Sequence, residues 1–249
     1  MTVTDKQINQ FREQGFFTTE VAFPAAELDE LKSEFHRVWN EDIRNAEARG
    51  SANLELVRLR PFLERMHARS EACARFCRQP VFAEITRRLL GDNVDLYYNQ
   101  AVLKPPAKGL DFAWHQDSRY TVTRPLEYVT CWVAVGKATV ANGTIWLTRG
   151  KHKDGLLPHT WNASRNEWQC QFDSSEKIPI ELEAGQMAVF SSLLPHASGP
   201  NTSDEIRYAY VPQYHVDHAV REESGEAVGD RFPVVRDGRP VMHPSFTDE

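Results

Sequence analysis

Residues 112–120 read FAWHQDSRY and place a histidine and an aspartate two positions apart, at His115 and Asp117. In a β-strand, side chains at positions i and i+2 point to the same face of the sheet. The pair would then present a neutral imidazole and a carboxylate side by side, and both groups are metal ligands. Two ligands alone make a poor metal site, so the chain must supply a third.

His196 is the best candidate for this third ligand because of its setting in QMAVFSSLLPHASGPN. A glycine turn leads into an apolar strand, and a short link then presents the histidine. Two histidines and one carboxylate on one face of an octahedral ion form the facial triad of non-haem Fe(II) oxygenases, which leaves three coordination positions open. Zinc accepts the same ligands, so a zinc-dependent cupin-like hydrolase, or another metalloenzyme that does not use 2-oxoglutarate, is the alternative.

The ordered series of motifs resembles the phytanoyl-CoA dioxygenase family of Fe(II)/2-oxoglutarate-dependent oxygenases. The likeness covers about residues 97–211 and is carried by YYNQAVLKPP, WHQD, RPLEYVTCWVAV, ANGTIWLTRGKHKDGLLPH, LLPHASGPN and IRYAYV. An arginine, Arg207, follows eleven residues after His196. FREQGFF near the N-terminus is similar to the family's common opening.

The resemblance implies that His115, Asp117 and His196 bind Fe(II) and form the catalytic set. It also implies that 2-oxoglutarate takes two of the open positions on the iron and that O₂ takes the last. The far carboxylate of 2-oxoglutarate needs a planar, charged fork, and Arg207 is the matching residue. Ser198 can add a hydroxyl donor to the same carboxylate.

Other matches to the family are less specific. Trp132 matches an aromatic residue near the cosubstrate, and it can equally be an ordinary core residue. Asn99 and Gln100 are neighbours on one expected strand, so one of them must face inward, and we select Gln100 for cosubstrate binding. Lys104 either resembles the family's pattern or solvates a strand end.

The implied reaction is hydroxylation of an unactivated C–H bond in a small-molecule metabolite, with release of succinate and CO₂. Natural-product biosynthesis is one setting for it. Relatives that halogenate replace the carboxylate with a small residue so that chloride can bind the iron, and Asp117 therefore favours hydroxylation. Desaturation and cyclisation stay open. The candidate pocket residues are mainly aromatic: Tyr97, Tyr98, Phe112, Ser118, Arg119, Tyr120, Trp146 and Trp161.

Helices and then strands must position these residues. Thr4 is expected to cap a first helix that Gly15 ends, and Pro24 and Gly50 bound a second helix with apolar residues at helical spacing. Two shorter helices meet near Pro80. After Gly91 the chain changes to short runs rich in Val, Ile, Tyr and Trp, which predicts antiparallel strands.

We therefore expect a mainly β protein with flanking helices and a double-stranded β-helix core of the jelly-roll or cupin-like class. Residues 1–249 are expected to form a single Fe(II)/2-oxoglutarate dioxygenase domain. Within it, 1–91 form a mainly helical flank, 92–220 the jelly-roll core and 221–249 a surface tail. A basic side chain from the helical flank, Arg58 or Arg60, could reach the cosubstrate, although a surface salt bridge is the simpler role.

The amino-acid composition limits the classes of binding partner that we expect. The net charge is −6 and no block of Lys and Arg stands out, so nucleic acid is not an expected partner. No apolar run is long enough to span a bilayer, and the N-terminus lacks the apolar core of a signal peptide. The four cysteines show no zinc-ribbon spacing and are expected to be buried thiols in a reducing compartment. We expect a cytoplasmic enzyme that acts on a small molecule.

Overall fold

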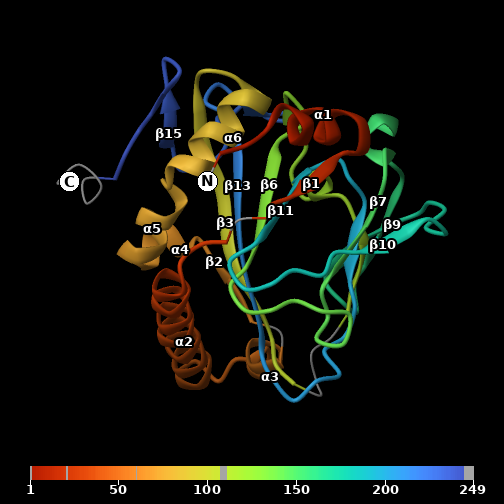
Figure 1. The fold of residues 1–249 in the computed structure, drawn as a ribbon. Coiled ribbons are helices and arrows are strands. Elements are labelled where there is room, and N and C mark those ends of the chain that lie inside the picture. Colours follow the sequence, from red (N-terminus) through yellow and green to blue (C-terminus); the bar gives the residue numbers. More distant parts are fainter. Residues whose placement is uncertain (1, 21, 60, 107–110, 244–249) are drawn as a thin grey trace.

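Two β-sheets face each other, and helices cover the outer side of the larger one (Figure 1). The computed structural model describes residues 2–20, 22–59, 61–106 and 111–243. All strand pairs in it are antiparallel. This arrangement is a jelly-roll core with flanking helices, and it confirms the fold class predicted from the sequence.

The large sheet runs in the order β1 (Phe16–Thr18), β11 (Met187–Ser191), β6 (Val129–Ala134), β13 (Arg207–Val216), β3 (Val94–Lys104), β15 (Phe232–Arg236) and β16 (Arg239–Pro240), with β2 (Phe62–Glu64) also paired to β3. The small sheet runs in the order β10 (Lys177–Pro179), β7 (Ile145–Thr148), β12 (His196–Ser198) and β4 (Phe112–His115). Two separate pairs are β5 (Thr123–Arg124) with β14 (Val220–Arg221), and β8 (His159–Asn162) with β9 (Glu167–Cys170).

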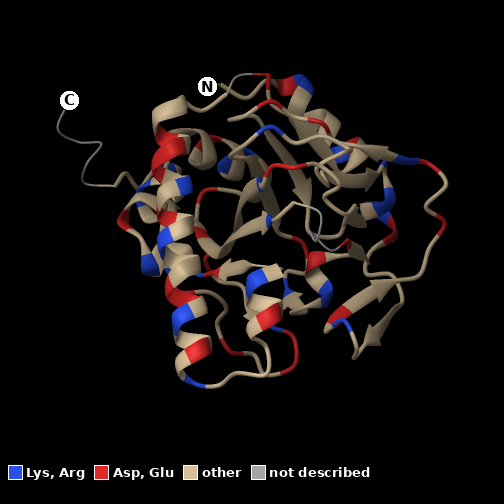
Figure 2. Cartoon of the chain, turned by 90° about the horizontal axis from the view of Figure 1, so that it is seen from below, with Lys and Arg blue, Asp and Glu red and all other residues tan. Residues whose placement is uncertain are grey.

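The helices are α1 (Asp5–Gln14), α2 (Ala25–Ala48), α3 (Leu54–Leu59), α4 (Met66–Arg69), α5 (Glu71–Cys77) and α6 (Pro80–Leu90), with short 3₁₀ turns η1 (Asp117–Arg119) and η2 (Lys151–Asp154). Thr4 caps α1 with a capping box, and Gly15 ends it in the left-handed conformation, as predicted. Pro80 is the first residue of α6, at the predicted boundary between two helices, and Gly91 follows the end of α6. In the view of Figure 2, acidic and basic residues are mixed along the helices.

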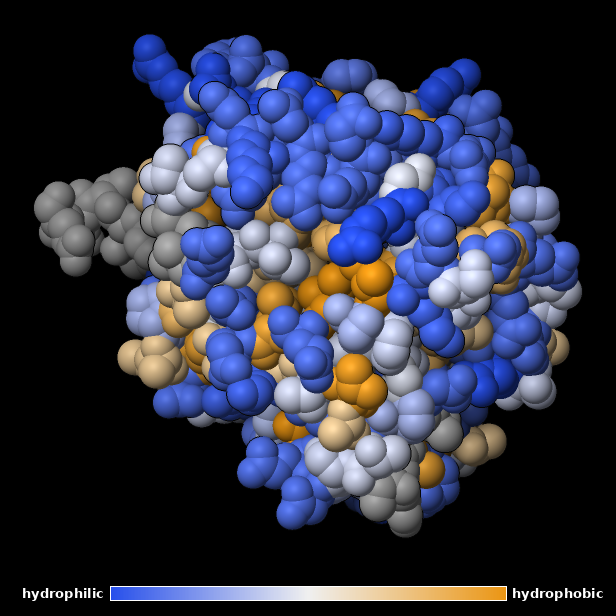
Figure 3. Space-filling model, turned by 45° about the vertical axis from the view of Figure 1, so that its right-hand side comes forward, coloured by the Kyte–Doolittle hydropathy of each residue, from blue (hydrophilic) through white to orange (hydrophobic). Residues whose placement is uncertain are grey.

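The large sheet is buried on both faces. In β6, Cys131 and Val133 belong to the cluster packed under the helices, whereas Trp132 and Ala134 belong to the cluster between the two sheets. Because side chains alternate across a strand, one run of apolar residues serves both layers. Cys73, Cys77 and Cys131 are buried free thiols, as expected. On the face shown in Figure 3, apolar residues gather in a hollowed area framed by hydrophilic ones.

Two parts of the chain differ from expectation. The helical flank also contributes β1 and β2, short strands that extend the large sheet. The expected surface tail contributes β15, which pairs with β3 and buries Val234 and Val235. β15 covers an edge of β3 that would otherwise expose unpaired backbone groups, so a short apolar run in a polar segment was sufficient to form a strand. Among the helices of the described ranges, none is long and apolar enough to cross a membrane.

Candidate functional site

Strand register brings the two predicted histidine ligands together. β4 pairs with β12 so that His115 lies directly opposite His196. The sequence placed Asp117 in the same strand as His115, but β4 ends at His115 and Asp117 begins the turn η1. Gln116 between them keeps an extended backbone, so the carboxylate still projects to the side of the histidine.

The three side chains form a compact cluster. Asp117 Oδ1 lies 3.6 Å from His115 Nε2 and 3.5 Å from His196 Nε2. The two imidazole rings have centroids 4.1 Å apart. One potential ligand atom of each residue lies within 4.8 Å of the others, a spacing that fits a shared metal ion. The spatial prediction that these residues meet is confirmed.

Backbone hydrogen bonds set the tautomer of both histidines. His115 Nδ1 lies 2.8 Å from the carbonyl oxygen of Ala113, and His196 Nδ1 lies 3.0 Å from that of Leu194. A carbonyl only accepts, so each Nδ1 donates and each Nε2 keeps a free lone pair toward Asp117. Burial, and then the neighbouring His115, lowers the pKa of His196 to about 4, which keeps this imidazole neutral.

Hydrogen bonds to Oδ2 hold the carboxylate of Asp117, whose Oδ1 faces the two histidines. Oδ2 accepts hydrogen bonds from Thr130 Oγ1 and Gln213 Nε2, both at 2.8 Å. Burial acts to raise the pKa of Asp117, but the groups around the carboxylate, which include the hydrogen-bonding Thr130 hydroxyl, outweigh it and lower the pKa. Oδ1 is therefore an ionised oxygen available as a ligand. Sequence reasoning missed Thr130 and Gln213, whose signal was their polarity within apolar strands that pair with each other.

Gln116 anchors the segment that carries the ligands. Its side chain is fully buried, donates to the carbonyl oxygens of Gly155 at 2.8 Å and Leu193 at 2.5 Å, and accepts from the amide of Leu157 at 2.7 Å. Its backbone N–H donates to His159 Nε2 at 3.2 Å. These bonds tie the loop after β4 to the loops that precede β8 and β12.

A cavity of about 660 Å³ opens beside the cluster, and Arg207 lies in its wall. Arg207 is 1% exposed, and its guanidinium makes one long hydrogen bond, at 3.4 Å to the carbonyl of Val102, while Nε has no partner. No carboxylate of the described residues pairs with it. The guanidinium carbon lies 5.2 Å from the ring centroid of Trp132, which also lines the cavity.

Lys104 adds a second cation to this end of the cavity. The register of β3 and β13 places Lys104 directly opposite Arg207, and Lys104 Nζ donates to Ser198 Oγ at 2.8 Å and to the carbonyl of Gly199. Lys104 is 5% exposed, so the alternative role of solvating a strand end is wrong. Ser198 and His196 are two apart on β12 and both line the cavity, so the cationic end continues into the metal-binding end.

Gln100 lines the cavity, whereas Asn99 points to the helical side, where it accepts from Tyr210 and contacts His67. The choice of Gln100 as the inward residue is thus confirmed, and its role in binding remains a prediction. Five candidate aromatic residues also line the cavity: Tyr97, Tyr98, Phe112, Tyr120 and Trp161.

Three pocket candidates were wrong. Ser118 is fully buried and donates to the carbonyl of Leu126 at 3.0 Å and to Ser192 Oγ at 2.8 Å. Arg119 stacks on Trp168, with its guanidinium carbon 3.9 Å from the ring centroid. None of the three residues Ser118, Arg119 and Trp146 lines the cavity.

The structure describes one of the two candidate arginines of the helical flank. Arg58 forms surface salt bridges with Glu47 at 2.6 Å and Glu55 at 3.3 Å, the simpler of its two expected roles. Arg60 lies outside the described residues.

Comparison with known proteins agrees with this geometry. The sequence profile of the phytanoyl-CoA dioxygenase (PhyH) family matches residues 11–209. A probable phytanoyl-CoA dioxygenase of Caenorhabditis elegans is 30% identical over 160 residues, which cover 59% of this chain and 51% of the relative. The chain therefore spans about half the length of that relative.

Solved structures share the architecture. The non-haem monooxygenase ThoJ in its apo form superposes with a TM-score of 0.70 and 26% identity, over 94% of this chain and 88% of that protein. EvdO2 from Micromonospora carbonacea var. aurantiaca, complexed with 2-oxoglutarate, has a TM-score of 0.69 and 20% identity, over 93% of this chain and 96% of that protein. At this identity the second likeness shows the fold alone.

Proposed function

We propose, from the premise that this chain belongs to the phytanoyl-CoA dioxygenase family, that it is a non-haem Fe(II)- and 2-oxoglutarate-dependent oxygenase that hydroxylates an unactivated C–H bond of a small-molecule metabolite. One observation carries the choice: Arg207 is a buried, charged group without a carboxylate partner among the described residues, and it lines the cavity that also holds the metal ligands. Burial of a cation without an anion destabilises the folded state, so we infer that this site binds an anion. A zinc hydrolase needs no such group, which favours the oxygenase.

The donor set fits ferrous iron. His115 and His196 offer neutral Nε2 atoms, and Asp117 offers an ionised Oδ1, so three positions on an octahedral ion stay open. The hydrogen bonds to both Nδ1 atoms and to Asp117 Oδ2 fix the direction of each ligand before the ion arrives. Iron with 2-oxoglutarate and O₂ supplies the oxidation that converts C–H to C–OH and 2-oxoglutarate to succinate and CO₂.

The chain's own residues then orient the cosubstrate. We assign the far carboxylate of 2-oxoglutarate to Arg207, Lys104 and Ser198, which converge at one end of the cavity. Burial lowers the pKa of Arg207 to about 9, so the guanidinium is still charged at neutral pH. Trp132 and Phe190 form apolar walls between the two ends and exclude water from the reacting centre.

We extend the proposal to organisation and location. Residues 1–249 act as one domain, because β1, β2 and β15 join the same large sheet as the central strands. The cysteines among the described residues are free thiols, which supports a cytoplasmic location.

The test combines spectroscopy with product analysis. Anaerobic addition of Fe(II) and 2-oxoglutarate should give a weak visible charge-transfer band, and admission of O₂ should release succinate. Asp117→Ala should remove both signals, whereas Asp154→Ala, which changes an exposed aspartate on η2, should keep them. Absence of the band in the wild type, or a band unchanged in Asp117→Ala, would contradict the proposal.

A further inference from the structure

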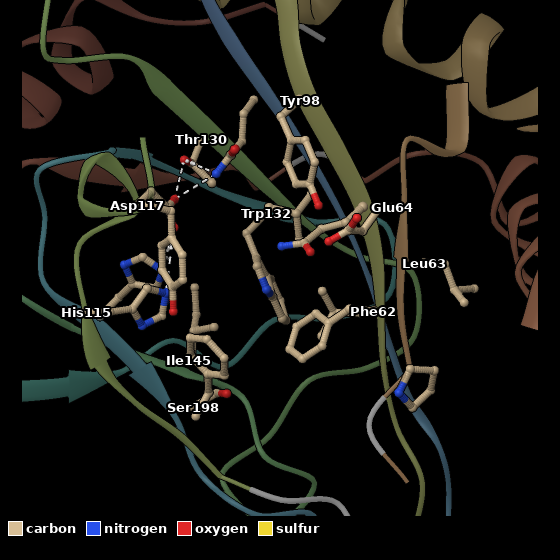
Figure 4. A pocket seen from close by; sticks show the side chains of 18 of the residues that line it. Phe62, Leu63, Glu64, Tyr98, His115, Asp117, Thr130, Trp132, Ile145 and Ser198 are labelled. Atoms are coloured by element: carbon tan, nitrogen blue, oxygen red, sulfur yellow. Dashed lines mark hydrogen bonds and ion pairs between the residues drawn. The ribbon is translucent and has the colours of Figure 1, made fainter. Parts of the chain in front are cut away.

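The wall of the cavity across from the metal-binding residues carries a carboxylate, Glu64. β2 pairs with β3 so that Glu64 lies opposite Gln100. Leu63 is buried in the core under the helices, so its neighbours Phe62 and Glu64 face the other side, where they line the cavity. Figure 4 shows Glu64 beside Tyr98, with Trp132 between them and the cluster of His115 and Asp117.

Glu64 lacks a counter-charge among the described residues. No Lys or Arg of the described ranges forms a salt bridge with it, and its exposed side chain lines the cavity. Other charged residues that line this end are already paired. Asp42 contacts Arg69 at 2.5 Å, and Arg165 contacts Asp111 at 2.9 Å. The described part of the mouth therefore offers one uncompensated negative charge.

Tyr98 and Gln100 complete a polar patch around this carboxylate. They are two apart on β3, so they share the face on which Glu64 lies, and both line the cavity. Burial, and then the charge of Glu64, raises the pKa of Tyr98, so its hydroxyl remains protonated as a donor. The patch is thus a carboxylate with neutral neighbours.

The cavity that contains this patch also has exposed apolar side chains in its lining. Four large hydrophobic side chains are exposed in the described part of the chain, and three of them line this cavity: Leu56 at 43%, Tyr120 at 44% and Trp161 at 43%. Exposed apolar residues gathered at a cavity mouth mark a binding surface for an apolar ligand.

We propose, as an extension that rests on the proposed function, that the molecule hydroxylated here is an apolar compound bearing a protonated amine, and that Glu64 binds the amine. The exposed apolar residues of the lining hold the apolar body, and the cation meets Glu64, which has no counter-charge among the described residues. An acyl-coenzyme A thioester fits poorly, because its phosphates require Arg or Lys at the mouth, and the arginine that the described lining offers there, Arg165, is paired with Asp111.

The test measures binding of three probes with the same apolar body: 4-phenylbutylamine, 4-phenylbutanol and 4-phenylbutyrate. Calorimetric titration into anaerobic protein loaded with Fe(II) and 2-oxoglutarate should give a Kd for the amine about three- to tenfold below that for the alcohol. Glu64→Gln should raise the Kd of the amine to that of the alcohol. Glu64→Lys should reverse the order and favour 4-phenylbutyrate.

Glu176→Gln is the matched control, because it makes the same charge change at an exposed glutamate outside the cavity lining. It should keep the preference for the amine. Equal affinity of wild type for amine and alcohol, or a preference that survives in Glu64→Gln, would overturn the inference. The visible band is recorded in the same samples. A band without amine preference overturns the substrate class alone, whereas an amine preference that depends on Glu64, without a band, supports the Glu64 site and overturns the proposed function.

Discussion

Arg207 should affect stability and binding in opposite directions. Burial lowers its pKa from 12.5 to about 9, which corresponds to a penalty of at most about 5 kcal/mol on the charged form. Relaxation of the surroundings reduces this penalty, so we expect Arg207→Met to raise the free energy of unfolding of the ligand-free protein by about 1–3 kcal/mol. For a chain of this size, each kcal/mol raises Tm by about 2–4 °C.

The same substitution should strongly reduce the stabilisation of the protein by 2-oxoglutarate. With Mn(II) in place of iron, 2-oxoglutarate at about 100 times its Kd should stabilise the wild type by about 2.7 kcal/mol. Loss of a buried charge-assisted pair typically costs about 2–5 kcal/mol, so the Kd of the variant should rise by about 30-fold or more. At the same ligand concentration a 30-fold higher Kd leaves about 0.9 kcal/mol of stabilisation, so the rise in Tm should fall to about a third of the wild-type rise or less.

The pH dependence of the stability difference gives a further check. A base whose folded pKa is lowered destabilises the folded state below that pKa, and the penalty disappears as pH rises through it. The excess stability of Arg207→Met should therefore shrink as pH rises above about 9. Thermal scans measure each quantity, and Arg44→Met, at an exposed arginine, should change stability by less than about 0.5 kcal/mol. A variant that is less stable than wild type without ligand, or that keeps the Tm rise with 2-oxoglutarate, would refute the reasoning.

The remaining predictions concern the supports of the site. Gln213→Leu and Thr130→Val should each weaken Fe(II) binding by about 10- to 100-fold in a metal titration, with an unchanged near-ultraviolet dichroism spectrum; unchanged affinity would show that Asp117 needs no second anchor. Gly143→Ala should lower Tm and weaken 2-oxoglutarate binding, because at φ +82° its Cβ would lie 2.6 Å from the carbonyl oxygen of Gly199. The control is Gly50→Ala, at φ +58° with open space around it. It should lower the free energy of unfolding by about 1 kcal/mol and leave 2-oxoglutarate binding intact. Removal of metal by a chelator should lower Tm in the wild type and leave it unchanged in Asp117→Ala.

Local features were readable from the sequence because they depend on few neighbours. The capping box at Thr4 and the stop at Gly15 are satisfied within one helical turn, so their residue types predict them. His115 and His196 were found because metal ligands must be particular residue types in extended segments. Their meeting required only that the two segments pair as strands.

Features that depend on register were not readable. Thr130 and Gln213 support Asp117 because β6 and β13 pair at those positions, and a shift by one residue would turn both away. Gln116 was overlooked because its role is to join three loops. Arg119 was placed in the pocket on its position beside the HxD motif, whereas stacking on Trp168 draws it elsewhere. Glu64 carries no sequence signal, because a three-residue strand in a helical region has too few residues to show a period.

The opposition of His115 and His196 across β4 and β12 has a consequence for biosynthesis. These partners are separated by 81 positions in the chain. During translation, His115 therefore leaves the ribosome before His196 has been added to the chain. A nascent polypeptide that stops before β12 lacks His196, so the proposed metal site is completed only after β12 has been synthesised.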